Sequence, residues 1–190
     1  MTCGESLIFV FCRFLADGVE LSADQVKCEL RLADHACGAR NIGKRRIDIG
    51  ALGLEPDGRF LFFPANPARP EKRHDRAAEL AAACEADLLT GGSIEPERMP
   101  LWINAADAVL VTSDYEGFGM AAIEALACDV PVLSTPVGIA PYALEGIDGC
   151  LCAPFDVEVW APVARRALEA PDPRVAGAGR AQTLSASGMA

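Results

Sequence analysis

The sequence predicts an α/β fold in which helices cover both faces of a parallel sheet. Short apolar segments alternate with helical segments, the pattern of successive strand–helix–strand units joined by right-handed crossovers. The apolar segments show little polar alternation, as expected for strands that are buried on both faces. In chain order the predicted strands lie at 60–63, 86–89, 108–112, 130–134 and 150–153.

The predicted helices fall between and after these strands. An alanine-rich helix follows the first strand, and the last predicted helix follows the fifth strand. Parallel strands need such long connections, because a short hairpin can join only antiparallel neighbours. In chain order the predicted helices span 75–84, 96–105, 119–127, 140–144 and 157–168.

Two glutamates stand at the connection between the third strand and the helix after it. Glu116 is followed at once by Gly117-Phe118-Gly119, and Glu124 lies eight positions after Glu116. The glycine turn places backbone amides at a helix N-terminus, which suits a phosphate or a polar sugar. If both glutamates were helical, about two turns and about 12 Å of rise would separate them.

Each carboxylate can accept hydrogen bonds from two neighbouring hydroxyls. Two such groups at this separation suit a ligand with two polyol ends, such as a nucleotide sugar with its ribose and its hexose. The ordinary alternative is a helix with one solvated glutamate at each end. Spacing alone favours that alternative, because glutamate is common on helices.

The residues around the glutamates resemble the donor-binding half of GT-B glycosyltransferases of family 4, the "glycosyl transferases group 1". The runs Glu-Gly-Phe-Gly, Glu-Ala-Leu-Ala-Cys and Pro-Val-Leu-Ser-Thr-Pro-Val-Gly follow one another in the family's order. The resemblance extends over residues 52–168. It implies a Rossmann-like domain, the C-terminal half of a GT-B fold, that binds a nucleoside-diphosphate sugar.

The resemblance also implies roles for individual residues. Glu116, as the catalytic-site glutamate, would contact the donor sugar. The amides of Gly117, Phe118 and Gly119 would hold the sugar and the phosphate. Glu124 would bind the ribose hydroxyls.

The cations for a diphosphate are expected on the loop after the first strand, because no Lys or Arg stands between Arg98 and Arg165. Loops at the carboxyl ends of strands are where open α/β sheets bind ligands. In the resemblance, Lys72 falls on the family lysine, but the family arginine falls on Pro67. Arg69 is the nearest substitute. A solvated basic helix start is the alternative, although cations are mildly unfavourable there.

Composition excludes some partners. The chain has 17 basic and 27 acidic residues and a formal charge of −10, which argues against nucleic acid or an anionic membrane as the main partner. The apolar segment 6–15 is too short to span a bilayer and lacks the basic start and cleavage site of a signal peptide. We expect a cytoplasmic protein, with peripheral contact at the inner membrane left open.

No metal cofactor is expected. A cluster that could suggest zinc lacks any Cys-x-x-Cys pair, and no Asp-x-Asp motif occurs. Metal-free donor binding agrees with the resemblance. The cluster consists of Cys3, Cys12, Cys28, Cys37 and His35.

The predicted organisation has two parts. Residues 1–50 form an N-terminal extension of uncertain structure, and residues 51–190 form the donor-binding domain, truncated at its C-terminus. We expect a hexosyltransferase fragment that acts with retention and needs an N-terminal acceptor domain or a separate acceptor-domain chain. Two alternatives stay open: a non-catalytic nucleotide-sugar-binding subunit of a two-chain transferase, and an inactive gene fragment.

Overall fold

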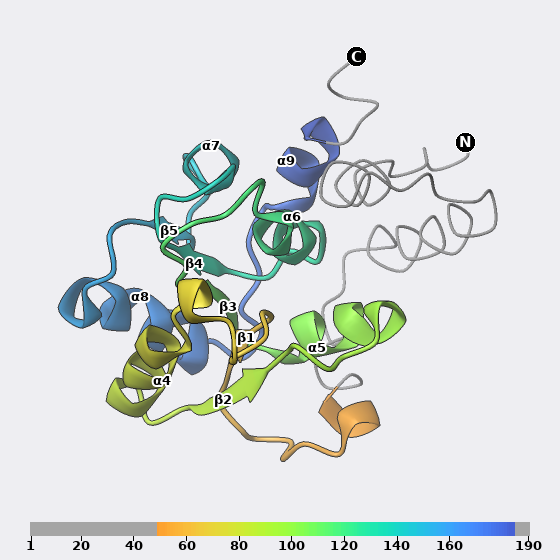
Figure 1. The fold of residues 1–190 in the computed structure, drawn as a ribbon. Coiled ribbons are helices and arrows are strands. Elements are labelled where there is room, and N and C mark those ends of the chain that lie inside the picture. Colours follow the sequence, from red (N-terminus) through yellow and green to blue (C-terminus); the bar gives the residue numbers. More distant parts are fainter. Residues whose placement is uncertain (1–48, 185–190) are drawn as a thin grey trace, which may run out of the picture.

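One sheet of five parallel strands forms the centre of the computed structural model, which describes residues 49–184 (Figure 1). Every pair of neighbouring strands is parallel, so the predicted fold class is confirmed. Each strand lies within two residues of its predicted position, the usual uncertainty of element ends. The strands are β1 Phe60–Phe63, β2 Asp87–Thr90, β3 Ala108–Val111, β4 Val132–Ser134 and β5 Leu151–Cys152.

The helices between the strands also fall where the sequence predicts them. The 3-10 turn η1 at Pro70–Lys72 was not predicted, and the first turn of the helix predicted at 96–105 is a second 3-10 turn, η2 at Pro96–Arg98. Both begin at a proline, whose fixed φ suits the first position of a helical turn. The α-helices are α4 His74–Ala83, α5 Met99–Ala105, α6 Met120–Ala127, α7 Ala140–Ala143, α8 Val157–Glu169 and α9 Ala178–Thr183.

The last helix, α9, is an α-helix that was not predicted from the sequence. Its sequence, Ala-Gly-Arg-Ala-Gln-Thr, carries no apolar stripe to announce it. Tertiary contacts hold it instead: Asp129 Oδ1 accepts hydrogen bonds from the amides of Gly177 at 3.0 Å and Ala178 at 2.8 Å. Local sequence patterns cannot report a cap that comes from a loop almost fifty residues away.

Helices cover both faces of the sheet. Because side chains alternate along a strand, Leu61 and Phe63 pack with Leu80 of α4 and Trp160 of α8. Phe62 faces the other way and belongs to the core under α5, α6 and α9. In Figure 1, α4 and α8 accordingly lie on one side of the sheet, and α5, α6 and α9 lie on the other.

The strand order β2-β1-β3-β4-β5 has a reversal of direction between β1 and β3. From β1 the chain first adds β2 on one side, and it then adds β3, β4 and β5 on the other side. In open α/β sheets, ligands bind outside the carboxyl ends of the strands at such a switch point. The loops that follow β1 and β3 are therefore the loops in which a site is expected.

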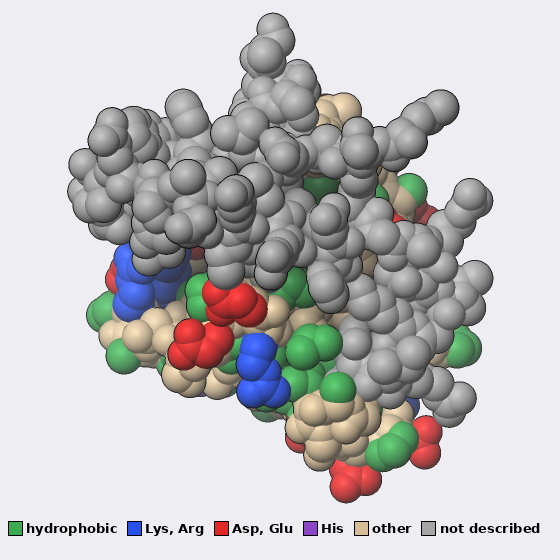
Figure 2. Space-filling model, turned by 90° about the vertical axis from the view of Figure 1, so that its right-hand side faces the viewer, with side chains coloured by type: hydrophobic (Ala, Val, Ile, Leu, Met, Phe, Trp, Pro, Cys, Tyr) green, Lys and Arg blue, Asp and Glu red, His purple; other side chains and the backbone are tan. Residues whose placement is uncertain are grey.

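The surface charges are mixed on the face that Figure 2 presents. Where this face is described, acidic and basic side chains stand beside one another, without one continuous basic area. Within residues 49–184, no helix is both long enough and apolar enough to cross a lipid bilayer.

Candidate functional site

Glu116 and Lys72 form an ion pair at the switch point between β1 and β3. Lys72 Nζ donates to Glu116 Oε2 at 2.6 Å, across 44 positions of sequence. Only 13% of the Lys72 side chain and 15% of the Glu116 side chain are exposed. A charge-assisted bond that is largely shielded from water is strong, but it leaves a costly unpaired charge if one partner is removed.

The other oxygen of Glu116 is also engaged. The hydroxyl of Ser113, a buried residue just after β3, donates to Glu116 Oε1 at 2.7 Å. Both carboxylate oxygens therefore have protein partners, and the orientation of the carboxylate is fixed. Ser113 was not predicted as a site residue.

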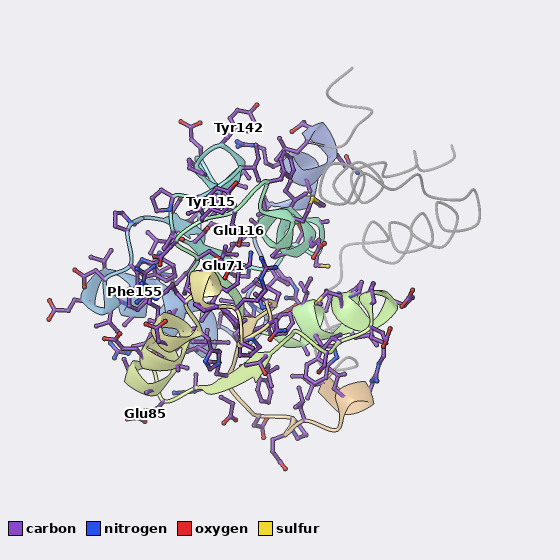
Figure 3. All side chains as sticks on the ribbon, viewed as in Figure 1. Glu71, Glu85, Tyr115, Glu116, Tyr142 and Phe155 are labelled. Carbon is purple, nitrogen blue, oxygen red and sulfur yellow. The ribbon has the colours of Figure 1, made fainter. Side chains whose placement is uncertain are left out.

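The loop that carries Lys72 is bonded to the segment after β3. Asp114 N donates to Glu71 O at 2.9 Å. The hydroxyl of Thr112 lies 3.0 Å from Lys72 O and 2.9 Å from Arg73 O. Figure 3 shows Glu71 and Glu116 near one another in front of the sheet. The backbone of residues 71–73, around Lys72, is thus held by the short segment 112–114 after β3.

Arg69, the other predicted cation, is placed differently. Its side chain is 60% exposed, and its guanidinium pairs with Glu71 at 2.6 Å. Among the residues that the structure describes, no hydrogen bond or ion pair joins the Arg69 side chain to Lys72 or Glu116; only the Arg69 carbonyl accepts a hydrogen bond from Lys72 N, at 3.0 Å. A diphosphate role for Arg69 stays a prediction, and it would require the side chain to leave Glu71.

Two further arginines, not predicted as site residues, lie at the rim of the site. Arg76 pairs with Asp114 at 2.7 Å and donates to Thr112 O at 3.0 Å. Arg73 pairs with Asp114 at 3.2 Å and adopts a left-handed conformation with φ 54°. The basic character of this stretch was visible in the sequence, but the bonds to Asp114 depend on the fold.

The glycine turn after Glu116 is packed against the loop that follows β4. Phe118 O accepts a hydrogen bond from Ile139 N at 2.7 Å. Gly138 has φ 52°, and a Cβ there would lie 2.4 Å from Phe118 O. The turn ends at Gly119, which has φ 92° and precedes the first residue of α6. The conformation of the turn is therefore fixed by the loop after β4 and by the left-handed Gly119.

Glu124 lies in the middle of α6, whereas Glu116 lies in the loop before that helix begins at Met120. The spacing of two helical turns, which would hold only if both glutamates were helical, does not apply, because Glu116 precedes α6 and Gly119 at the helix start is left-handed. Burial raises the pKa of the Glu124 carboxyl from its ordinary value near 4.5 to about 7. No hydrogen bond or ion pair joins this carboxyl to another residue within 49–184, and its role toward a ribose stays a prediction.

No group of three or more His, Cys, Asp or Glu side chains is arranged to hold a metal ion in the described part of the chain. The cysteines there, Cys84, Cys128, Cys150 and Cys152, are free thiols. The residues that could suggest zinc, Cys3 to Cys37 with His35, lie outside the described residues. Metal-free binding stays a prediction.

Comparison with known proteins identifies the family to which the chain belongs. The family model "Glycosyl transferases group 1" matches residues 56–170, more than half of the chain. The chain therefore belongs to the glycosyl transferases group 1 family, as the resemblance implied.

The chain is similar in sequence to curated proteins that are named as glycosyltransferases. The D-inositol 3-phosphate glycosyltransferase of Mycolicibacterium paratuberculosis is 42% identical over 133 residues, covering 70% of this chain and 28% of that protein. Another enzyme of that name, from Thermobispora bispora, is 37% identical over 130 residues, covering 68% of this chain and 28% of that protein. The chain thus spans less than a third of the length of these relatives.

Solved structures share the fold. HepE of Anabaena in complex with UDP-glucose has a TM-score of 0.60 and 19% identity, covering 78% of this chain and 49% of that chain. The C-terminal domain of the glycosyl transferase LpcC of Francisella tularensis has a TM-score of 0.58 and 16% identity, covering 80% of this chain and 96% of that chain. The chain therefore has the fold of one half of a GT-B glycosyltransferase.

Proposed function

We propose that this chain is the donor-binding part of a retaining hexosyltransferase, which moves a hexose from a nucleoside diphosphate to an acceptor held by a separate domain or chain. The observation that carries the proposal is the Lys72–Glu116 pair, 2.6 Å apart at the β1/β3 switch point. A shielded cation and carboxylate at that edge match a ligand with an anionic and a polyol part.

Each group has a distinct task in this proposal. The diphosphate takes Lys72 as a partner, and Glu116 then accepts hydrogen bonds from the hexose. The amides of residues 117–119 bind phosphate and sugar oxygens. Glu124 accepts from the ribose hydroxyls. HepE, the neighbour with UDP-glucose bound, supports this ligand class at the level of the fold.

Transfer requires that negative charge on the leaving diphosphate be stabilised while the sugar becomes oxocarbenium-like. Lys72 and the turn amides would supply that stabilisation. Glu116 would orient the sugar and stabilise positive character near it. A metal ion has no part in the proposal, and a cytoplasmic location belongs to it as a prediction.

Titration calorimetry tests the proposal with UDP, GDP and their glucose conjugates. Because one side of the cleft belongs to another domain, we expect weak binding, with Kd on the order of 0.1–1 mM. Binding without transfer to any acceptor would favour a non-catalytic binding subunit. A folded sample that gives no heat with any nucleoside diphosphate or nucleotide sugar would exclude a donor-binding role.

A further inference from the structure

Ser113 is the buried residue that holds the site carboxylate. It is 2% exposed, and its hydroxyl donates to Glu116 Oε1 at 2.7 Å. Its own carbonyl accepts from the Thr135 hydroxyl at 2.6 Å. Ser113 is thus held by Thr135, directly after β4, and in turn holds a side chain of the candidate site.

A second buried serine at the same edge shows what an ordinary contact looks like. Ser134, at the end of β4, is fully buried, and its hydroxyl donates to the backbone oxygen of Thr135 at 2.7 Å. That hydrogen bond satisfies the Ser134 hydroxyl and involves no residue of the candidate site. The Ser113 hydroxyl instead donates its one hydrogen bond to the Glu116 carboxylate, a charged side chain of the site.

The hydrogen bond from Ser113 determines which oxygen of Glu116 faces Lys72. With Oε1 occupied by Ser113, Oε2 is the oxygen that faces Lys72. When a diphosphate offers Lys72 another acceptor, Oε2 becomes free for a sugar hydroxyl while Oε1 stays bonded to the serine. A carboxylate that is already oriented loses less entropy when the ligand binds.

From this geometry we infer that Ser113 is a positioning residue for the donor hexose: it acts through Glu116 and touches no ligand itself. The inference rests on the proposed function. It predicts a specific pattern, because the serine should matter for the hexose and not for the nucleoside diphosphate.

The test compares the affinity of each nucleoside diphosphate with that of its glucose conjugate, using uridine, guanosine and adenosine forms and the full chain. Ser113→Ala should bind the nucleoside diphosphate within about twofold of the unsubstituted chain, yet lose most of the extra affinity that the glucose confers. Ser113→Cys keeps the side-chain volume with a weaker donor and should show the same loss. Ser134→Ala is the matched control and should retain the extra affinity.

The outcomes separate the two levels of the argument. If no nucleotide binds the unsubstituted chain, the proposed function falls, and the role of Ser113 falls with it. If the nucleotides bind but glucose adds no affinity, or if Ser113→Ala and Ser113→Cys keep what it adds, the positioning role alone is overturned. Equal losses in Ser113→Ala and Ser134→Ala would also overturn it, because they would mean general disturbance of the sheet edge.

Discussion

At the scale of single residues, the site depends on one shielded ion pair. Lys72 and Glu116 are each mostly buried, and Glu116 has partners on both oxygens. Without ligand, the positive charge of Lys72 is balanced within the protein. In the proposed function, a diphosphate would have to compete with Glu116 for Lys72, and this competition would limit the affinity of the chain for a donor.

Removing the Lys72 charge should weaken diphosphate binding selectively. Lys72→Ala should weaken nucleoside diphosphate binding by roughly 1–3 kcal/mol, the value of a lost charge-assisted hydrogen bond. Binding of the bare nucleoside should barely change. Calorimetry with both ligands measures the difference, and Arg166→Ala, an exposed cation on α8, is the control for net charge. Equal losses for both ligands would mean that Lys72 acts through folding.

The buried Glu124 carboxyl should make stability depend on pH. Its pKa rises from near 4.5 to about 7 on folding, so between these values the folded chain binds the proton more tightly than the unfolded chain does. The resulting stabilisation is fully present below about pH 4.5 and is lost as the pH rises through 7.

Chemical denaturation of the unsubstituted chain and Glu124→Gln measures this contribution. Since glutamine does not titrate, the difference in unfolding free energy between the two proteins isolates Glu124 from the other carboxyl groups. Relative to Glu124→Gln, the unsubstituted chain should lose stability between pH 4.5 and 8. A constant difference over that range would show that Glu124 titrates normally.

At the scale of elements, the loops of the carboxyl edge act as one unit. The segment after β3 bonds to the loop after β1 through Thr112 and Asp114. The turn before α6 packs on the loop after β4 through Gly138 and Phe118. The position of each ligand-binding group therefore depends on contacts between loops rather than on the loop that carries it.

A side chain at Gly138 should displace the turn at residues 117–119, which we propose to bind phosphate. Gly138→Ala adds a Cβ that would lie 2.4 Å from Phe118 O. Gly146→Ala is the matched control, because Gly146 also has positive φ, at 71°, but has nothing within 4 Å of its added Cβ. Both should lose about 1–2 kcal/mol from the left-handed backbone, and Gly138→Ala should lose about 1–3 kcal/mol more from the clash.

Denaturation curves give both losses, and calorimetry should show weaker nucleoside diphosphate binding for Gly138→Ala alone. If the two variants were equally stable and bound equally well, the contact between the two loops would have no role in shaping the turn.

The elements also show where prediction from sequence succeeds. The apolar strands such as β1 and β3 were predicted to within a residue or two, because burial on both faces leaves a continuous apolar run. The helix α9 was missed, since its cap comes from Asp129 and its own residues carry no periodic signal. Local sequence patterns predict local structure, but they do not predict contacts made by residues far away in the sequence.

The same division holds for the site. The resemblance pointed to Lys72, Glu116 and Glu124, and the structure shows that the first two form an ion pair. The bond from Ser113 could not be predicted, because its direction depends on the path of the chain after β3. The pairing of Arg69 with Glu71 could not be predicted either. It leaves the Arg69 side chain, which was predicted to bind the diphosphate, mostly exposed to solvent.

At the scale of the whole molecule, the strand order explains why the site lies where it does. The reversal between β1 and β3 leaves their following loops side by side, and those loops carry Lys72 and Glu116. The chain has the fold of one half of a GT-B glycosyltransferase and spans less than a third of its curated relatives. The acceptor, the sugar and transfer itself therefore belong to the proposal.

The most direct test of the donor-binding account separates the two glutamates by ligand. Glu124→Ala should weaken ribonucleotide binding by roughly 1–3 kcal/mol and leave 2′,3′-dideoxy analogues nearly unchanged, because those analogues lack the hydroxyls that Glu124 binds. Glu116→Ala should not weaken nucleoside diphosphate binding, because it removes the carboxylate that competes for Lys72, and it should remove the extra affinity that an attached hexose confers. The reverse pattern, or equal binding of ribose and dideoxy ligands by the unsubstituted chain, would contradict the account.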